Sequence, residues 1–466
     1  MVYLSQKKKK MMEYGYYIDK VNTYRKGILE AAGGRRLPGP ESVKKILLIA
    51  SAPRTGSSLL FDILKRASGM YSLAGEDVPY YKLNGLSSDL AMSDAISDAR
   101  DASGADERLA NDLLGDMRVS GIEGKFPADR DGVERYIVDI ALRFSIEWPL
   151  VDLSYEKFRS LALEAYDVYG SENRKFDKTE FYLRLIRGLR TVYKEIDPYY
   201  YDIPAASIKK WFPEQRVPEG PPNDVLMIEE PPFILLAPSD KVTDKDLREK
   251  TLLLKSSVNC YRMGYVRKLF PSADIKVIYL TRNPAASISG LYEGWLHRGF
   301  FSHNLRHLKE KTGLLPDGLD IKGYSNTGPW GRWWWNFDLP PGWQDYTRRK
   351  LAEVCAFQWA SANSAILELI ENDASNFTRV RYEDLVLDDN FRLDEIRRLL
   401  NYAGVVDDIT GKMSLKALPV IQATSHPVLY RWKKMRDIII PLTESHAIKT
   451  IAEGMGYTAS GAGDWT

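Results

Sequence analysis

The chain has 466 residues, of which 44% are hydrophobic and 27% charged, the balance of an ordinary globular protein with a large core. Its formal net charge of only +2 gives no reason to expect a nucleic-acid partner. No apolar run is as long as a membrane span, and no secretory signal pattern is present, so we expect no transmembrane segment. The two cysteines, Cys260 and Cys355, lie in apolar surroundings, which favours buried thiols and a cytoplasmic location.

The first predicted elements are a lead-in segment and a buried strand. Residues 1–40 form the lead-in, because they end in a run rich in glycine and proline over 33–40. Five apolar residues from Ile46 to Ala50 then predict a strand of a parallel sheet. A polar loop follows, and an apolar helix begins near Leu59.

The loop between this strand and this helix carries one cation, one glycine and three hydroxyls, in the order Pro53-Arg54-Thr55-Gly56-Ser57-Ser58. Backbone N–H groups, hydroxyls and the positive end of a helix dipole together favour a bound phosphate group. The ATP-type P-loop is a different pattern, because it ends in Gly-Lys-Ser/Thr, whereas Ser57 follows Gly56 here and the cation precedes it. An ordinary strand-loop-helix connection is the alternative interpretation of this segment alone.

A second short strand is expected near Tyr71, and it ends in the acidic turn Gly75-Glu76-Asp77. From residue 80 to residue 248 tyrosines, charges and helical spacing dominate, and prolines interrupt the later part. We interpret 80–248 as a mostly helical insertion. Residues 41–79 and 249–460 then form one discontinuous α/β core domain.

The core pattern resumes at residue 250. The run Leu252–Leu254 predicts a strand that ends at Lys255, and 274–281 predicts a strand that ends at Arg282. A further strand is expected over 377–382. Strands that alternate with helices predict a parallel sheet flanked by helices, and ligands of such sheets collect at the carboxyl ends of the strands.

A tryptophan-rich segment precedes the last of these strands. Two interpretations are open for its rings, stacking on a sugar or a flat apolar ligand and packing in the core. The residues concerned are Trp330, Trp333, Trp334, Trp335 and Trp343.

Four segments of the chain, in this order, resemble the sulfotransferases that use 3′-phosphoadenosine 5′-phosphosulfate (PAPS). They are 53–60, the segment from Lys255 to Phe270-Pro271, 279–289, and Arg381-Tyr382-Glu383-Asp384-Leu385. The resemblance covers about 44–78 and 250–457. It implies a P-loop-like sulfotransferase core, PAPS as co-substrate and no metal. Independently, the five histidines form no zinc-binding pattern.

Sulfuryl transfer requires the acceptor oxygen, the sulfur and the leaving phosphate oxygen in line, with a base for the acceptor proton and cations at the leaving oxygen. The resemblance implies that Arg54 faces the 5′-phosphate and the leaving oxygen. It makes Lys255 the second cation at the transferred group, with a surface lysine as the alternative. The 5′-phosphate is then wrapped by Thr55, Gly56, Ser57 and Ser58.

The segment after the third core strand resembles the 3′-phosphate motif of these enzymes. The guanidinium of Arg282 suits a terminal phosphate, because it can donate two parallel hydrogen bonds. The serine that the family places eight residues later is Gly290 here, which departs from the pattern. Ser287 or Ser289 is expected to replace it, and the sequence does not decide between them.

The remaining candidates concern the adenine and the base. The resemblance places Tyr382 near the adenine, where its ring gives a stacking face, although a buried tyrosine at a strand end fits equally well. Glu76 is the first candidate for the general base, Asp77 the second and His297 the histidine alternative. Plain solvation of an acidic turn is the competing interpretation.

The sequence therefore predicts an enzyme that moves a sulfuryl group from PAPS to an acceptor hydroxyl, with the insertion covering a small-molecule or lipid-like acceptor. One alternative is a P-loop kinase or other phosphotransferase, but neither a Walker lysine nor a magnesium-holding aspartate after a strand is found. The other is a non-catalytic nucleotide-binding relative. The presence of all three cations, Arg54, Lys255 and Arg282, favours catalysis.

Overall fold

The computed structural model describes most of the chain. The described ranges are 2–34, 37–86, 93–99, 103–119, 129–172, 176–198, 203–215, 219–230, 235–297, 300–308, 315, 317–412, 418, 421 and 430–457, with the backbone alone for 2–14, 103 and 170–172.

A six-stranded sheet forms the centre of the fold, in the order β3-β2-β4-β1-β5-β8. Five strands run parallel, and β3 is antiparallel to β2. The expected parallel sheet flanked by helices is thereby confirmed. The strands are β1 (Lys45–Ala50), β2 (Met70–Ser72), β3 (Arg118–Val119), β4 (Thr251–Lys255), β5 (Asp274–Thr281) and β8 (Phe377–Arg381).

The apolar run of β1 is continuous because both faces of this central strand are covered. Ile46, Leu48 and Ala50 belong to the hydrophobic cluster on one face of the sheet, and Leu47 and Ile49 belong to the cluster on the other face. Successive side chains of a strand point to opposite faces, so a strand buried on both sides needs apolar residues at every position.

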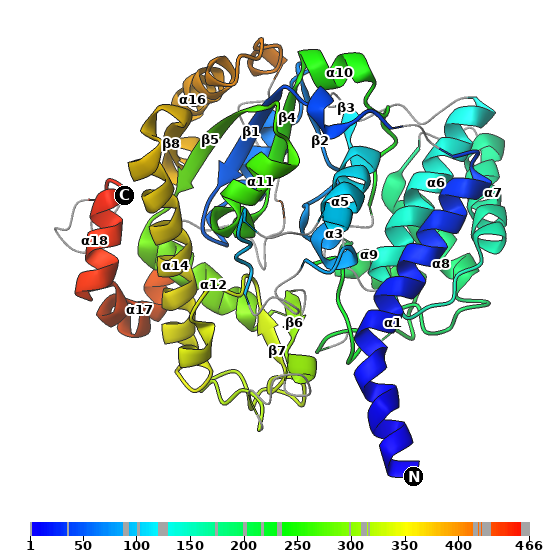
Figure 1. Cartoon of the computed structure of the whole chain (residues 1–466), viewed down its shortest axis with the longest axis horizontal. Helices are drawn as coiled ribbons and strands as arrows, with labels where there is room; N and C mark the ends of the chain where they lie inside the picture. The colour runs from blue at the N-terminus through cyan, green and yellow to red at the C-terminus, as the bar shows by residue number, and fades with distance from the viewer. Residues whose placement is uncertain are drawn as a thin grey trace.

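The helices divide between these two faces (Figure 1). One face is covered by α2 (Ser57–Leu64), α15 (Tyr382–Val386) and α16 (Asp389–Tyr402). On the other face lie α3 (Val78–Leu83), α5 (Ser103–Asp116), α11 (Met263–Leu269), α12 (Pro284–Trp295) and α14 (Leu351–Asn372). The helices α17 (Arg436–Thr443) and α18 (His446–Gly454) pack on α12 and α14. The short α10 (Asp244–Glu249) leads into β4, and 3-10 turns occupy η1 (Pro40–Ser42), η2 (Ser257–Tyr261), η3 (Trp343–Tyr346), η4 (Ala374–Asn376), η5 (Thr410–Lys412) and η6 (Arg431–Met435).

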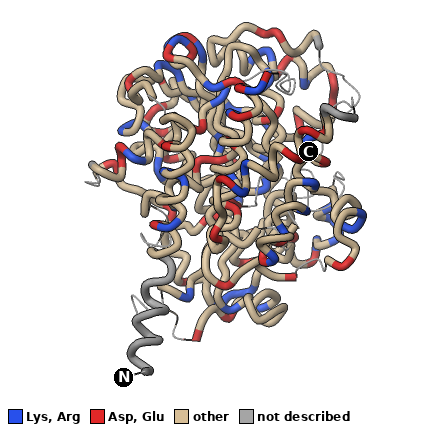
Figure 2. Tube along the Cα trace, turned by 90° about the vertical axis from the view of Figure 1, so that its right-hand side faces the viewer, with Lys and Arg blue, Asp and Glu red and all other residues tan. Residues whose placement is uncertain are grey.

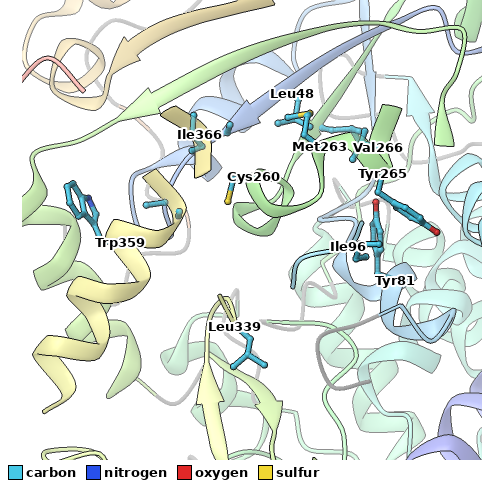
Figure 3. Packing of buried hydrophobic residues seen from close by; sticks show 14 of the residues in the cluster. Leu48, Tyr81, Ile96, Cys260, Met263, Tyr265, Val266, Leu339, Trp359 and Ile366 are labelled. Atoms are coloured by element: carbon cyan, nitrogen blue, oxygen red, sulfur yellow. The ribbon is translucent and has the colours of Figure 1, made fainter. Parts of the chain in front are cut away.

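The largest core lies between the sheet and α11, α12 and α14. Figure 3 shows Leu48 of β1 beside Met263 and Val266 of α11, while Trp359 and Ile366 extend from α14. The expected burial of the cysteines is confirmed, since both Cys260 and Cys355 are buried free thiols in this core.

A second hydrophobic cluster lies beside the sheet and consists of helices. It joins α6 (Arg130–Glu147), α7 (Tyr155–Glu172), α8 (Lys178–Leu189) and α9 (Ala205–Trp211), together with Ile28 of α1 (Val2–Ala31). Aspartates fix two helix starts: Asp129 accepts a hydrogen bond from the backbone N of Gly132, and Asp177 accepts one from that of Glu180. The strand β3 also falls between residues 80 and 248, and the sequence pattern did not indicate it.

The tryptophan-rich segment packs around a small antiparallel pair, β6 (Phe301–Asn304) and β7 (Trp334–Asn336). Trp334, Trp335 and Trp343 are at most 1% exposed, so core packing is the correct interpretation for these three rings. Trp330 and Trp333 are only partly buried and pack against Phe301 and Trp334.

Charges of both signs are interspersed along the fold (Figure 2). Among the described residues, no helix is long and apolar enough to cross a membrane.

Candidate functional site

The sheet gathers the candidate residues at the carboxyl ends of its five parallel strands. The loop 51–56 follows β1, and the turn with Glu76 follows β2. Lys255 ends β4, Arg282 follows β5 and Tyr382 follows β8. This edge is where open α/β sheets bind ligands, because the connecting loops leave a crevice there.

The loop after β1 is shaped by two residues with left-handed backbone. Arg54 has φ 64° and Gly56 has φ 105°, and the hydroxyl of Thr55 donates to the carbonyl oxygen of Ala52 at 2.7 Å. An ideal Cβ on Gly56 would lie 2.4 Å from Cδ2 of Tyr382, so only glycine allows the ring to lie against the loop. Ser57 and Ser58 open α2, so their backbone N–H groups lie at the N-terminal end of the helix.

Arg282 connects this loop with Tyr382. Its Nη1 donates to the carbonyl oxygen of Arg54 at 2.9 Å, and its guanidinium lies 4.5 Å from the centre of the Tyr382 ring. Gly56, Arg282 and Tyr382 therefore form one contiguous group, although each comes from a different strand end. The Arg54 guanidinium lies 4.9 Å from the ring centre of Phe300, which fixes the opposite side of the loop.

The glycine that stands in place of the expected serine, Gly290, lies in α12. An ideal Cβ on Gly290 would lie 3.4 Å from Cβ of Arg54, so this helix position faces the loop directly. Ser289 is buried, and its hydroxyl contacts Sδ of Met435 at 3.7 Å. The Ser287 hydroxyl is fully buried and has no hydrogen-bond partner among the described residues.

Glu76 and Lys255 form an ion pair at the same edge. Lys255 lies opposite Ile49 in the register of β4 with β1, which places it next to the start of the loop 51–56. Its side chain is 9% exposed and that of Glu76 is 20% exposed. The pair therefore retains partial access to solvent.

The second base candidate, Asp77, is held in a buried network. Nη2 of Arg262 lies 3.1 Å from Oδ1 of Asp77, and the amide of Asn259 donates to Oδ2 at 3.0 Å. The guanidinium of Arg262 in turn lies 3.6 Å from the ring centre of Tyr81. Both carboxylate oxygens of Asp77 are thus engaged, which favours Glu76 over Asp77 as the group facing a ligand.

The histidine alternative lies on another side of the loop. His297 follows the end of α12, and its ring centre is 5.8 Å from that of Phe300. The Phe300 ring therefore lies near both the His297 ring and the Arg54 guanidinium.

Glu383 supports the site but was not singled out from the sequence. It accepts hydrogen bonds from the backbone N of Asn283 and from the Tyr457 hydroxyl, both at 2.8 Å. The backbone directly after Arg282 is thereby fixed to the segment that carries Tyr382. The signal was present in the Arg-Tyr-Glu-Asp-Leu motif, but a motif does not reveal a bond to a residue 100 positions away.

Among the described residues, no group of three or more histidine, cysteine, aspartate or glutamate side chains has an arrangement that could hold a metal ion.

No protein-family model and no curated protein sequence matches this chain. Among solved structures, the sulfotransferase domain of the Synechococcus PCC 7002 olefin synthase aligns with 91% of this chain and 99% of its own length, at 13% identity and a TM-score of 0.31. The sulfotransferase STF1 from Mycobacterium tuberculosis H37Rv aligns with 86% of this chain and 77% of its own length, at 12% identity and a TM-score of 0.30. TM-scores this low establish no shared fold, and only the chain's own residues bear on its function.

Proposed function

We propose that this protein is a sulfotransferase that moves a sulfuryl group from PAPS to an acceptor hydroxyl. One observation carries the proposal. The phosphate-type loop with Arg54, the cation Lys255 and the Arg282–Tyr382 pair meet at one edge of a parallel sheet. These are the groups that a donor with a 5′-phosphosulfate, a 3′-phosphate and an adenine requires.

The residues present fit such a donor. Three buried hydroxyls near this edge, those of Ser51, Ser256 and Ser287, have no hydrogen-bond partner among the described residues. Ser51 and Ser256 directly follow β1 and β4. A buried hydroxyl without a partner is costly, and a phosphate oxygen offers the missing acceptor.

In the proposed reaction Lys255 has two successive partners. In the unliganded protein its ammonium pairs with the carboxylate of Glu76, so the lysine occupies that carboxylate. PAPS supplies an activated sulfuryl group on a phosphate leaving group. Lys255 then donates to the leaving oxygen, beside Arg54, and releases Glu76 toward the acceptor.

Glu76 accepts the proton of the acceptor hydroxyl at a carboxylate oxygen. At the same time the hydroxyl oxygen bonds to sulfur, and the bond between sulfur and the leaving phosphate oxygen breaks. Arg54 and Lys255 stabilise the negative charge that develops on that oxygen. The backbone N–H groups at the start of α2 hold the 5′-phosphate.

We infer a small-molecule or lipid-like acceptor. The support is the aromatic pair beside Arg54, where the buried Phe300 packs on the partly buried Phe337 with ring centres 4.8 Å apart. Phe337 adopts a left-handed backbone, with φ 61°, which is rare for a bulky residue and is concentrated at functional sites.

Transfer of label from ³⁵S-PAPS to a panel of hydroxyl compounds tests the proposal. Lys255→Ala is expected to lower the rate about 100-fold or more, and to keep affinity for 3′-phosphoadenosine 5′-phosphate (PAP). Lys250→Ala is the matched control, because Lys250 precedes the opposite end of β4 and pairs with Asp246 at 3.0 Å. Transfer of phosphate from ATP in place of sulfate from PAPS would contradict the proposal, as would equal rates for Lys255→Ala and Lys250→Ala.

A further inference from the structure

The turn that carries Glu76 contacts a charged side chain at each of four consecutive residues, 74–77. The backbone N of Ala74 donates to Oδ2 of Asp116 at 3.0 Å. Gly75 lies against the guanidinium of Arg143, and Glu76 pairs with Lys255. Asp77 is held by Arg262 and Asn259, so both sides of the turn are fixed.

Gly75 is the point of closest approach. An ideal Cβ at this position would lie 2.4 Å from Nη2 of Arg143 and 3.5 Å from Oε1 of Glu229. Arg143 and Glu229 are 3% and 1% exposed, and Nη2 and Oε1 lie 2.8 Å apart. The buried contact between Arg143 of α6 and Glu229 of the segment 219–230 therefore lies directly against the backbone that precedes Glu76.

The charges around this pair do not balance if every group is ionised. Among the described residues, the cluster contains three cations and four carboxylates: Arg118, Arg143 and Lys241 with Asp116, Asp139, Glu147 and Glu229. Lys82 also acts on Glu229, but it pairs with Glu230, so this second pair adds one charge of each sign. The hydroxyl of Tyr80 also faces it. Excess charge in a buried cluster is costly, and one bound proton removes it.

Glu229 is the carboxylate of this cluster that we expect to hold the bound proton. Its Oε2 is buried and has no hydrogen-bond partner among the described residues. Burial raises the pKa of Glu229 to about 8, and the opposing charge of Arg143 does not cancel this shift. The carboxylates of Asp116 and Glu76 contribute to this rise in the pKa, and the Lys82 ammonium opposes it.

We propose that Arg143 and Glu229 are positioning residues for Glu76, and that Glu229 must carry a proton for the site to bind its anionic donor at full strength. The inference rests on the proposed function, in which Glu76 is the base and the donor is a polyanion. A protonated Glu229 supports the turn without adding charge. An ionised Glu229 places a second negative charge behind Glu76 and weakens the electrostatic attraction for the phosphates.

The first test is the affinity for PAP measured by calorimetry between about pH 7 and pH 9, a range that spans the raised pKa of Glu229. We expect the affinity of the wild-type protein to fall about three- to tenfold over this range. Glu229→Gln keeps an oxygen for Arg143 and cannot ionise, so its affinity is expected to stay level. A wild-type affinity that is level across this range overturns the proposal without any variant.

Asp338→Asn is the matched control for this titration. Asp338 is also a buried acid, and burial raises its pKa to about 7, but it bonds to Tyr261 and Gln358. Its substitution should leave the wild-type decline in PAP affinity intact. Loss of that decline in Asp338→Asn would show a general effect of buried acids and would overturn the role of Glu229.

A double-mutant cycle separates this inference from the proposed function. Glu76→Gln, Glu229→Gln and the double variant are compared by unfolding near about pH 6 and pH 9, on either side of the raised pKa of Glu229. We expect additive effects at the lower pH and non-additivity of about threefold or more in the unfolding constant at the higher pH. If Glu76 and Glu229 are coupled but the protein does not bind PAP, the proposed function alone is contradicted. If the protein binds PAP but the effects of the two substitutions are additive at both pH values, this inference alone is contradicted.

Discussion

Arg282 donates a hydrogen bond to the backbone carbonyl of Arg54, at 2.9 Å, and so joins two strand ends that are 228 residues apart in the chain. In the proposed function these two arginines serve opposite phosphates of one donor. The bond fixes the distance between their loops before any ligand binds. Such preorganisation lowers the entropy that binding must supply.

Gly56→Ala should remove donor binding through a steric clash and not through backbone strain alone. Both Gly56 and Gly342 have positive φ, 105° and 81°, but an added Cβ meets Tyr382 at 2.4 Å only at Gly56, whereas Gly342 has open space. We expect each alanine variant to lose about 1–2 kcal/mol of stability from strain. Only Gly56→Ala should also lose PAP affinity, by about tenfold or more, in a calorimetric titration. Equal PAP affinity in the two variants would contradict the contact between the loop and Tyr382 as a binding element.

Substitution of Asp77 should mainly lower stability, whereas substitution of Glu76 should mainly lower the rate of transfer. Asp77→Asn leaves Arg262 buried without its counter-charge, so we expect a loss of about 3–5 kcal/mol in the free energy of unfolding. Glu76→Gln affects a partly exposed pair and should cost about 1 kcal/mol or less, while transfer from PAPS falls about 100-fold or more. Denaturant unfolding and the ³⁵S transfer assay measure both quantities. The reverse result, with Asp77→Asn stable and inactive, would make Asp77 the base.

The chain itself predicts much of this site, because the strands are strongly patterned. The runs that form β1, β4 and β5 end at polar residues, and parallel strands bring such ends to one edge. The strand pattern points to one edge of the sheet, and the resemblance to the sulfotransferase motifs implied that Arg54, Lys255 and Arg282 belong to a common site there.

Other parts depend on contacts that no local pattern reveals. Asp77 meets Asn259 and Arg262 across 182 and 185 residues, so the sequence could not show that its carboxylate is occupied. Gly290 departs from the expected motif, and the sequence could not show that this position faces the Arg54 loop. The two-residue strand β3 is too short to produce an alternating pattern.

Ser287→Ala should identify the serine that binds phosphate. Its hydroxyl is buried without a described partner, so its removal should leave the stability unchanged or raise it by about 1 kcal/mol. PAP affinity should fall about fivefold or more, because a charge-assisted hydrogen bond is lost. Ser289→Ala is the control, since that hydroxyl already contacts Met435. Reduced PAP affinity in Ser289→Ala alone would assign the role to Ser289.

Asp338 should make the stability of the protein depend on pH. Burial raises its pKa from 3.8 to about 7, so the folded protein keeps a proton that the unfolded chain releases within this window. The proton on Asp338 makes its full contribution to the free energy of unfolding below about pH 4. This contribution is lost as the pH rises to about 7, at up to about 1.4 kcal/mol per pH unit. The difference in unfolding free energy between wild type and Asp338→Asn should shrink accordingly.

The exposed Asp345 provides the comparison for that titration. The difference in unfolding free energy between wild type and Asp345→Asn should not follow the slope expected for Asp338→Asn. A wild-type protein and an Asp338→Asn variant with parallel stability curves across this window would show that Asp338 is ionised in the folded state.

A thermal unfolding titration with PAP, run beside ATP with Mg²⁺, tests the central claim most directly. A ligand present at about 100 times its dissociation constant stabilises the folded state by about 2.7 kcal/mol, which is a readily measured rise in the melting temperature. The proposed donor site predicts that PAP raises the melting temperature and that ATP with Mg²⁺ does not. A rise with ATP and Mg²⁺ alone would contradict the sulfotransferase assignment and favour a phosphotransferase.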